Sequence, residues 1–396
     1  MFKRHLLTIL AFCAGLPAAR ALAQYEFFTP RGSFAVEVSL ENTAKFRLPI
    51  YRNAITSLAC QGDFAIGGTS ANEGLSPFLF AVSLSKKELV AAFDLAEKIP
   101  GQRSIQSGFG RVGDAFYAGT LPDREGESGH LIKVTFNGSR FTVDDLGEAV
   151  SGEGVFALTA DPDRNKLYGI SHPGGKFFSY DIASTAKKVY DEIALTRQHL
   201  GYYHSYAVEP ADILSRRLVL DRQGRVFGSR PINSVFRYDP ATDKIETLAE
   251  ELPEVWGRKA LGRADSWALA PDGTIYGGNA GDGQLFRINP DTGKLVNLGK
   301  PIMSWRMKGI AFGADGKLYG VAGSLPGYAH LFAYDPVAGG YKDMGNPRFP
   351  LNAPEIAGEL PWRSFQIATV TASEDGRWII MGEEESLSQL MVFPVE

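Results

Sequence analysis

Two histidines and three tyrosines fall within eight consecutive residues of this sequence, which is a dense grouping of proton-transferring side chains. Residues 199–206 read HLGYYHSY, in a chain that has six histidines in all. A histidine moves a proton near neutral pH, and a tyrosine can give a proton to a leaving oxygen. The segment therefore predicts a catalytic site, with Tyr202, Tyr203, His204 and Tyr206 as candidate residues.

A second set of candidates consists of five arginines, four of them beside an aromatic residue, which recur in step with a repeat of the chain. A guanidinium fork suits a carboxylate or a sulfate, and an aromatic face can stack on a sugar ring. We predict that this set binds an anionic glycan, although equal packing between repeat units would produce the same pattern. The set consists of Arg52 after Tyr51, Arg103 after Gln102, Arg258 near Trp256, Arg306 after Trp305 and Arg363 after Trp362.

The elements that would position these residues come from a unit that repeats along the chain. Each unit has a short apolar strand, a turn, an aromatic residue followed by a small one, and a further strand that ends near Asp-Pro. A period of roughly 50 residues is typical of four-stranded propeller blades. Seven units therefore predict an all-β, seven-bladed β-propeller with antiparallel blades. Their small residues are Gly67, Ala118, Gly169, Gly228, Gly277, Gly320 and Gly382.

Turn residues separate the strands of each unit. The pairs Asp272-Gly273 and Asp315-Gly316 lie between apolar runs, and such pairs form tight hairpin turns because both residue types tolerate a left-handed backbone. The last unit, residues 365–395, supplies only three strands, and residues 33–40 have the alternation of a fourth. We predict that this N-terminal segment pairs with the last blade and closes the ring.

The repeat places three further candidates on one face. In a propeller, the connection that enters each blade and the connection between its second and third strands open on the same side, which we call the top face. His172, Arg230 and Asn279 occupy equivalent positions in the second of these connections. We predict that His172 and Arg230 meet the tyrosine segment there and that Asn279 binds substrate. The alternative for His172 is a simple turn residue before Pro173.

The N-terminus has the pattern of a signal peptide. Lys3 and Arg4 precede an apolar stretch, and Ala21-Leu22-Ala23 matches a cleavage site. We therefore expect a signal peptide over residues 1–23, a secreted or periplasmic protein, and one propeller domain over residues 24–396.

Charge and composition narrow the possible partners. Removal of the signal peptide leaves 38 basic against 45 acidic residues, a net charge of −7. That argues against nucleic-acid binding, which needs an extended basic surface. No later apolar run reaches the roughly 18 residues that span a bilayer, so no membrane span is predicted. Cys60 would be the one remaining cysteine, so no internal disulfide is expected, and we expect a monomer.

With these features the chain resembles the secreted bacterial seven-bladed propellers, and among them the polysaccharide lyases of the ulvan-lyase type. In those enzymes a histidine and a tyrosine carry out β-elimination on a uronic acid while an arginine holds its carboxylate. The resemblance implies the following roles here. Arg230, helped by Arg258 or another arginine of the set, would neutralise the carboxylate. His172 or His204 would take the C5 proton, and one of the three tyrosines would protonate the departing oxygen.

Two other functions stay open at this point. One is a propeller without catalytic activity that displays the arginines and tryptophans to an anionic glycan or a protein. The other is a metal-dependent hydrolase or lactonase, for which Asp265, Asn279 and Glu383 are scattered candidate ligands. The sequence has no HExxH, CxxC, P-loop, GxSxG or GxGxxG motif in the context that its function needs, so no cofactor is predicted and the need for a divalent metal stays open.

Overall fold

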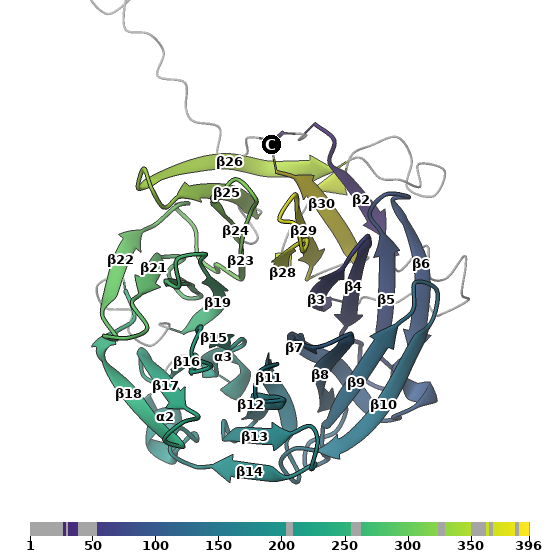
Figure 1. The fold of residues 1–396 in the computed structure, drawn as a ribbon, viewed down its shortest axis with the longest axis vertical. Helices are drawn as coiled ribbons and strands as arrows, with labels where there is room; N and C mark the ends of the chain where they lie inside the picture. The colour runs from purple at the N-terminus through teal and green to yellow at the C-terminus, as the bar shows by residue number, and fades with distance from the viewer. Residues whose placement is uncertain are drawn as a thin grey trace, which may run out of the picture.

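The computed structural model describes residues 27–28, 31–38, 54–202, 209–254, 263–323, 329–349, 362–363, 367–384 and 388–395. Seven sheets stand in a ring around a central axis, as Figure 1 shows. Each sheet is one blade, with its first strand at the centre and its fourth strand at the rim. The predicted all-β, seven-bladed β-propeller is therefore confirmed.

In blades 1 to 6 four antiparallel strands follow one another along the chain. Blade 1 contains β3 (Ile55–Gln61), β4 (Phe64–Thr69), β5 (Phe78–Ser83) and β6 (Glu88–Asp94); blade 2 contains β7 (Gln102–Val112), β8 (Ala115–Pro122), β9 (His130–Phe136) and β10 (Phe141–Glu148); blade 3 contains β11 (Gly154–Asp161), β12 (Lys166–His172), β13 (Phe177–Asp181) and β14 (Lys187–Tyr190). Blade 4 contains β15 (Val219–Leu220), β16 (Val226–Arg230), β17 (Ser234–Asp239) and β18 (Lys244–Glu251); blade 5 contains β19 (Ala264–Leu269), β20 (Ile275–Asn279), β21 (Leu285–Ile288) and β22 (Leu295–Gly299); blade 6 contains β23 (Gly309–Phe312), β24 (Leu318–Ala322), β25 (His330–Asp335) and β26 (Gly340–Phe349).

A few elements lie outside this regular pattern. The outer strand β26 of blade 6 carries two further short strands, β1 (Phe27–Phe28) and β27 (Trp362–Arg363). The short 3-10 helix η1 (Leu95–Glu97) follows β6. The connection from blade 3 to blade 4 contains the helices α2 (Arg197–Tyr202) and α3 (Pro210–Ile213), which the sequence did not predict.

The small residue of each repeat has a structural reason. Gly169 in β12 lies directly opposite Phe178 in β13, and a Cβ on this glycine would come within 2.3 Å of the Phe178 ring. Gly277 and Phe286 form the same pair, at 2.2 Å. The phenylalanine ring therefore lies flat over its cross-strand glycine, and cross-strand pairs of this kind stabilise sheets. The same pairing recurs in three other blades as Gly67 with Phe80, Gly228 with Phe236, and Gly320 with Phe332.

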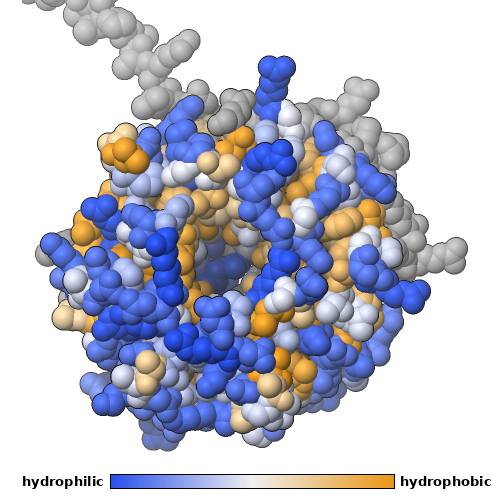
Figure 2. Space-filling model, in the orientation of Figure 1, coloured by the Kyte–Doolittle hydropathy of each residue, from blue (hydrophilic) through white to orange (hydrophobic). Residues whose placement is uncertain are grey.

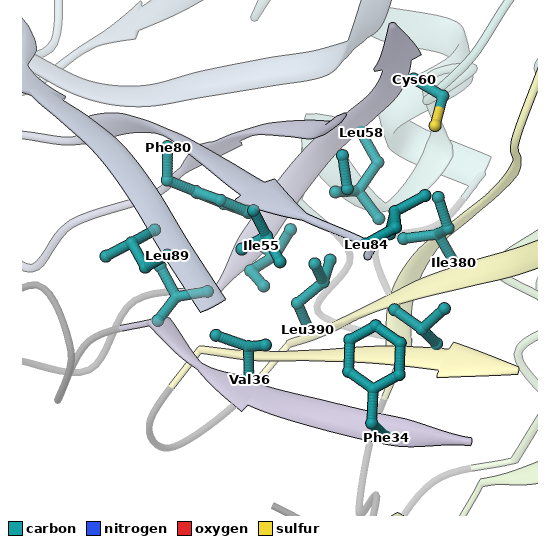
Figure 3. Packing of buried hydrophobic residues seen from close by; sticks show 14 of the residues in the cluster. Phe34, Val36, Ile55, Leu58, Cys60, Phe80, Leu84, Leu89, Ile380 and Leu390 are labelled. Atoms are coloured by element: carbon teal, nitrogen blue, oxygen red, sulfur yellow. The ribbon is translucent and has the colours of Figure 1, made fainter. Parts of the chain in front are cut away.

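The ring closes in blade 7 as the sequence predicted. This blade contains β28 (Ile367–Ala372), β29 (Trp378–Glu383), β30 (Gln389–Pro394) and, as its fourth strand, the N-terminal β2 (Phe34–Glu37). Figure 3 shows the buried apolar cluster where blade 7 meets blade 1, with Phe34 and Val36 of β2 packed toward Leu390 and Ile55. Closure thus joins the two ends of the sheet series through an apolar core.

Some expectations concern residues outside the described part of the chain. The predicted signal peptide over residues 1–23 is one of them. Among the residues that are described, no helix is both long enough and apolar enough to cross a membrane.

Candidate functional site

The innermost strands of the seven blades surround a channel along the axis, and Figure 2 shows hydrophilic surface around its opening. We call the half of the channel in which these strands begin the upper channel, and the half in which they end the lower channel. The upper channel lies at the top face. It holds a cavity of about 40 Å³ that is lined by Ala54, Thr56, Gln106, Arg216, Arg217, Asp265 and Glu384.

Asp265, near the start of β19, is a fully buried carboxylate at the centre of the charged groups. Nε of Arg263 lies 2.6 Å from its Oδ1, and Nη2 of Arg263 donates to Oδ2 at 3.3 Å. Nε of Arg216 lies 3.9 Å from the same Oδ1. Burial alone would raise the pKa of Asp265, but Arg263, Arg216 and Lys308 outweigh burial and hold it below its usual value. Asp265 therefore stays ionised and orients the guanidinium groups around it.

The segment between α3 and β15 positions Arg216 and Arg217. Ser215 is fully buried, where its Oγ accepts from the Ser229 N–H at 3.1 Å and donates to the Arg217 carbonyl at 2.8 Å. Helix α3 is tied to the same region because Nη1 of Arg263 donates to the carbonyl of Ala211 at 2.5 Å. Hydrogen bonds to blades 4 and 5 thus hold this connection against the channel.

Lys308 and Glu384 form a second buried ion pair beside the first group. Lys308 comes immediately before β23, and Glu384 comes immediately after β29. Burial lowers the pKa of Lys308 to about 8, although Glu384 acts to raise it. Burial would raise the pKa of Glu384, but Lys308 and Arg216 hold it below its usual value. At neutral pH both groups are charged, and Lys308 is the more easily neutralised of the two.

Arg217 crosses the channel and separates its two halves. Its Nη2 donates to Oγ1 of Thr369 in β28, on a blade three positions away around the ring. A Cβ on Gly108 would lie 2.7 Å from Nη1 of Arg217, and Gly108 has a φ of +74°, so this position needs glycine for two reasons. The guanidinium is surrounded by protein yet faces the open channel, and burial lowers the pKa of Arg217 to about 10.

The lower channel differs in charge. Below Arg217 the lining residues are mostly of uncharged, apolar types, but many of their side chains pack between the blades, so the surface that faces the channel is mainly polar. Each of the seven innermost strands or the residue before it contributes to this wall. The apolar lining residues include Leu58, Phe109, Leu158, Leu218, Trp267, Ile310 and Val370. The ionised groups that the structure describes in the channel are therefore concentrated in the upper half.

The upper channel carries more positive than negative charge. Among the described residues, six ionised side chains line the cavity or form an ion pair with its wall, namely Arg216, Arg217, Arg263, Lys308, Asp265 and Glu384. Four cations face two carboxylates, and among the described residues Nε of Arg216 has no hydrogen-bond partner. Guanidinium and ammonium groups with unused donors bind carboxylate, sulfate or phosphate oxygens through charge-assisted hydrogen bonds. The arrangement can therefore hold an anion at the top face.

His172, at the end of β12, is half-buried and stacks on Phe156 with 5.4 Å between the ring centroids. Burial lowers the pKa of His172, while Glu153 and Glu209 act in the other direction. A histidine with a lowered pKa is neutral at pH 7 and can accept a proton. Its neighbour Glu153 is engaged by Ser171 at 2.6 Å and by Lys176 at 3.0 Å.

Arg230, at the end of β16, points toward the outer part of its blade, where Nη1 donates to Oγ1 of Thr247 at 2.9 Å. It lies close enough to His199 to lower the pKa of that histidine, after the larger effect of burial. Among the described contacts, none joins Arg230 to His172 or to the upper channel. The predicted meeting of His172 and Arg230 therefore has no direct contact to support it.

The tyrosine segment lies almost entirely outside the described residues. Tyr203, His204 and Tyr206 fall there. Tyr202 is the last residue of α2, and only its backbone is described. The predicted grouping of this segment with His172 stays a prediction.

Among the members of the predicted substrate-binding set whose side chains are described, Arg306 is the one that reaches the charged group. Its positive charge helps to lower the pKa of Glu384, after burial and the larger effects of Lys308 and Arg216 are counted. Trp305 beside it is 46% exposed, so its indole can contact a ligand at the surface. Arg103 is exposed at the start of β7.

The other members of the set are placed differently. Trp362 and Arg363 form β27, whose backbone pairs with the rim strand β26. Asn279 is fully buried and donates to the Pro253 carbonyl at 2.8 Å, while its Oδ1 accepts from Gly281 and Asp282, so its polar atoms already have partners. Arg52, Trp256 and Arg258 lie outside the described residues.

The sequence pattern named Asp265, as a possible metal ligand, but it did not indicate the four cations of the upper channel. The prediction relied on arginines beside aromatic residues, whereas Lys308 and Arg263 lie closer to their strands than Arg306 and Arg258 do. Arg216-Arg217 directly before the apolar Leu218-Val219-Leu220 was the available signal. The first residues of an innermost strand, and those just before it, are the ones that reach the axis.

The described residues contain no group of three or more His, Cys, Asp or Glu side chains that could hold a metal ion. Of the candidate metal ligands named from the sequence, Asp265 forms an ion pair with Arg263, and Glu383 is fully buried at the end of β29.

Comparisons with known proteins show the fold. No protein-family model matches the chain, and no curated protein matches its sequence. A solved structure of a catalytically inactive variant of virginiamycin B lyase from Staphylococcus aureus, with quinupristin, is similar with a TM-score of 0.58 and 10% identity over 87% of this chain and 96% of that one.

Two further solved structures illustrate how varied the similar proteins are. The β-propeller domain of Cps50 (Swd1) from a Myceliophthora thermophila source has a TM-score of 0.56 and 12% identity, with 87% of this chain and 98% of that one covered. A putative 6-phosphogluconolactonase from Bacteroides uniformis has a TM-score of 0.51 and 13% identity, with 73% and 83% covered. At such low identity the likeness shows the β-propeller fold alone.

Proposed function

We propose that this protein is an exported polysaccharide lyase that binds an anionic, uronate-containing glycan on its top face and cleaves it by β-elimination. The observation that carries the proposal is the excess of cations in the upper channel, where Arg216 and Arg217 add to two ion pairs. Net positive charge in a partly enclosed site attracts an anionic ligand more strongly than the same charge would in water. Similarity in fold to a lyase agrees with this function without deciding the substrate.

The reaction would proceed as follows. A cation of the top face neutralises the uronate carboxylate, which makes the C5 proton more acidic. A general base removes that proton, the electron pair forms a double bond between C4 and C5, and the bond from C4 to the glycosidic oxygen breaks. A general acid then protonates the leaving oxygen. His172, neutral at pH 7, is a described candidate for the base, and His204 and the tyrosines of residues 202–206 remain candidates for base and acid.

The direct test is turnover. Purified protein is incubated with a panel of uronate-containing polysaccharides, and the ultraviolet absorbance of an unsaturated uronate product is followed. We expect absorbance to rise with at least one polymer. In His172→Ala we expect the rate of that rise to be lower by at least about tenfold if this histidine moves the proton. A control variant, His330→Ala, removes a histidine that pairs with Asp343 at 3.2 Å in blade 6, three blades around the ring from His172. No product on any polymer would overturn the lyase proposal.

A second candidate function is glycan binding without cleavage. It is favoured by one observation, which is that no described contact joins His172 to the charged groups of the upper channel. In that case the protein would retain polymers on an affinity gel without producing any unsaturated product, and Arg216→Gln would weaken retention while His172→Ala would not.

A further inference from the structure

The size of the upper-channel cavity limits what can enter it. About 40 Å³ is available between Arg216, Arg217, Asp265 and Glu384. Since about 10–15 Å³ of such space holds one water molecule, the cavity holds roughly three. That is room for the oxygens of a single charged substituent and not for a sugar ring. A larger ligand would therefore place one substituent in the channel and leave its remainder at the top face.

The charge of that substituent follows from the ion pairs. Arg263 is matched by Asp265, and Lys308 is matched by Glu384. Arg216 lies 3.9 Å from an Asp265 oxygen that Arg263 already contacts at 2.6 Å. Two of the four cations are thus left without a carboxylate of their own among the described residues.

The hydrogen bonds of Arg216 and Arg217 also indicate two cations without a counter-ion. Nε of Arg216 is buried and has no hydrogen-bond partner among the described residues. Arg217 donates from Nη2 to the neutral hydroxyl of Thr369 and has no described carboxylate within ion-pair distance. A guanidinium carries five N–H donors, so most of theirs remain available. The Arg216 side chain is 27% exposed, so the two cations are partly buried. A partly buried cation without a counter-ion is unfavourable, and a bound anion would reduce that penalty.

We infer that the upper channel binds a substituent that carries two negative charges, of the phosphate monoester class, held between the guanidinium groups of Arg216 and Arg217. The inference uses the binding site of the proposed function but does not depend on its reaction. A carboxylate or a sulfate ester, with one charge, would leave one of the two arginines uncompensated. A phosphate monoester is doubly charged above its second pKa of about 6.

Phenyl phosphate and phenyl sulfate provide the test, because they have nearly the same shape and differ by one charge at pH 7.5. We measure both dissociation constants by isothermal titration calorimetry with the full chain, at low salt, at pH 7.5 and pH 5. We expect phenyl phosphate to bind about 10- to 100-fold more tightly than phenyl sulfate at pH 7.5. At pH 5 the phosphate has lost its second charge, and we expect the two constants to agree within about threefold.

The site keeps its own charge between these two pH values. Asp265 and Glu384 have pKa values below their usual range, Lys308 has a pKa of about 8, and Arg217 has a pKa of about 10. The pH effect therefore reports the charge of the ligand.

Arg216→Gln identifies the location of binding. We expect this variant to reduce the preference for phosphate over sulfate at pH 7.5 to less than about threefold, because one cation remains uncompensated instead of two. Arg377→Gln, at an arginine whose side chain is 75% exposed in a turn of blade 7, is the matched control and should keep the preference. Thermal unfolding checks that both variants fold.

Three results would overturn the inference: equal constants for the two ligands at pH 7.5, no binding of either, or a preference that survives in Arg216→Gln. If neither ligand binds but uronate polymers are cleaved, the inference fails while the proposed function stands. If the phosphate preference is found but no polymer is cleaved, the proposed function fails while the inference stands.

Discussion

The two halves of the channel are built by the same seven strands and yet differ in the charge of the residues that line them. The upper half contains two ion pairs and two further arginines, whereas the lower half is lined by side chains such as Leu158 and Val370. The difference arises at the point where each innermost strand begins. Residues within the strands must pack between blades, so they repeat, while residues at the strand starts are free to differ from blade to blade. Functional chemistry in this fold is therefore a property of strand starts.

Arg217 lies at the boundary between the upper and lower channel. Replacement of its side chain should change the difference in charge between the two halves more than any other substitution considered below. In Arg217→Met the channel would carry no charged side chain among the described residues up to the level of Asp265. We expect the affinity for phenyl phosphate to fall by about 10- to 100-fold, because a charged hydrogen-bond donor is lost. Thermal stability should stay equal or rise, since a buried guanidinium that lacks its own carboxylate is unfavourable. Calorimetry and a thermal melt measure the two quantities; unchanged affinity would show that the anion binds elsewhere.

Gly108 tests the position of Arg217 without changing any charge. Gly108→Ala would place a methyl group 2.7 Å from Nη1 of Arg217, so we expect it to displace the guanidinium and weaken phosphate binding by roughly tenfold. Gly113→Ala is the matched control, because Gly113 also has a positive φ of +60° but no atom within 4 Å of the added methyl. Both variants should lose about 1–3 kcal/mol of unfolding free energy from backbone strain. An equal loss of binding in both would mean that strain, and not contact with Arg217, is responsible.

Lys308 should make anion binding sensitive to alkaline pH. Its pKa is about 8, so the upper channel loses one positive charge as the pH rises through that value. With phenyl sulfate, whose charge is constant, we expect affinity to fall about three- to tenfold between pH 7 and pH 9.5, and to stay level in Lys308→Gln. A constant affinity in the wild type would contradict a charged role for Lys308.

Lys308 also affects the free energy of unfolding, and the direction of this effect with pH follows from its pKa. Lys308 titrates near 8 when folded and near 10.5 when unfolded. Between these values the unfolded chain binds more protons, so the contribution of Lys308 to stability rises with pH across this window.

A substitution in the lower channel should have the smallest effect on phosphate binding. Trp267 lines this channel, and its indole Nε1 is buried without a hydrogen-bond partner among the described residues. Trp267→Phe should therefore leave phosphate affinity within about twofold and lower the unfolding free energy by about 1 kcal/mol or less. Calorimetry and chemical denaturation check this. A large loss of affinity would show that the ligand extends past Arg217, and the division of the channel would then be wrong.

The fold was predictable because its rules are local. Asp-Gly pairs set the turns, and the glycine after each aromatic residue is required by the phenylalanine ring across the strand pair, as in Gly277 with Phe286. Even the closure by residues 33–40 could be predicted, since one blade lacked a strand. The turn and glycine signals lie within one repeat unit, and the closure follows from counting the strands of the units.

The site was harder to predict because its geometry depends on register around a ring. Arg306 and Lys308 are two residues apart, yet Lys308 is buried in an ion pair while Arg306 is exposed at the top face. Arg217 meets Thr369 across the channel, from a position 152 residues away in the chain. No spacing within one unit indicates that contact, because it depends on where seven sheets bring their first residues.

The pairing of β2 with β30 also determines the order in which the chain can fold. Phe34 and Val392 are neighbours across that pair although 358 residues separate them in sequence. Bringing such distant segments together costs about 5 kcal/mol of chain entropy, far more than a hairpin within a blade requires. We therefore expect the six hairpin-built blades to form first and the seventh to be completed last. Until then the apolar seam of Figure 3 would be open to other chains, which makes this step the one at which aggregation would compete with folding.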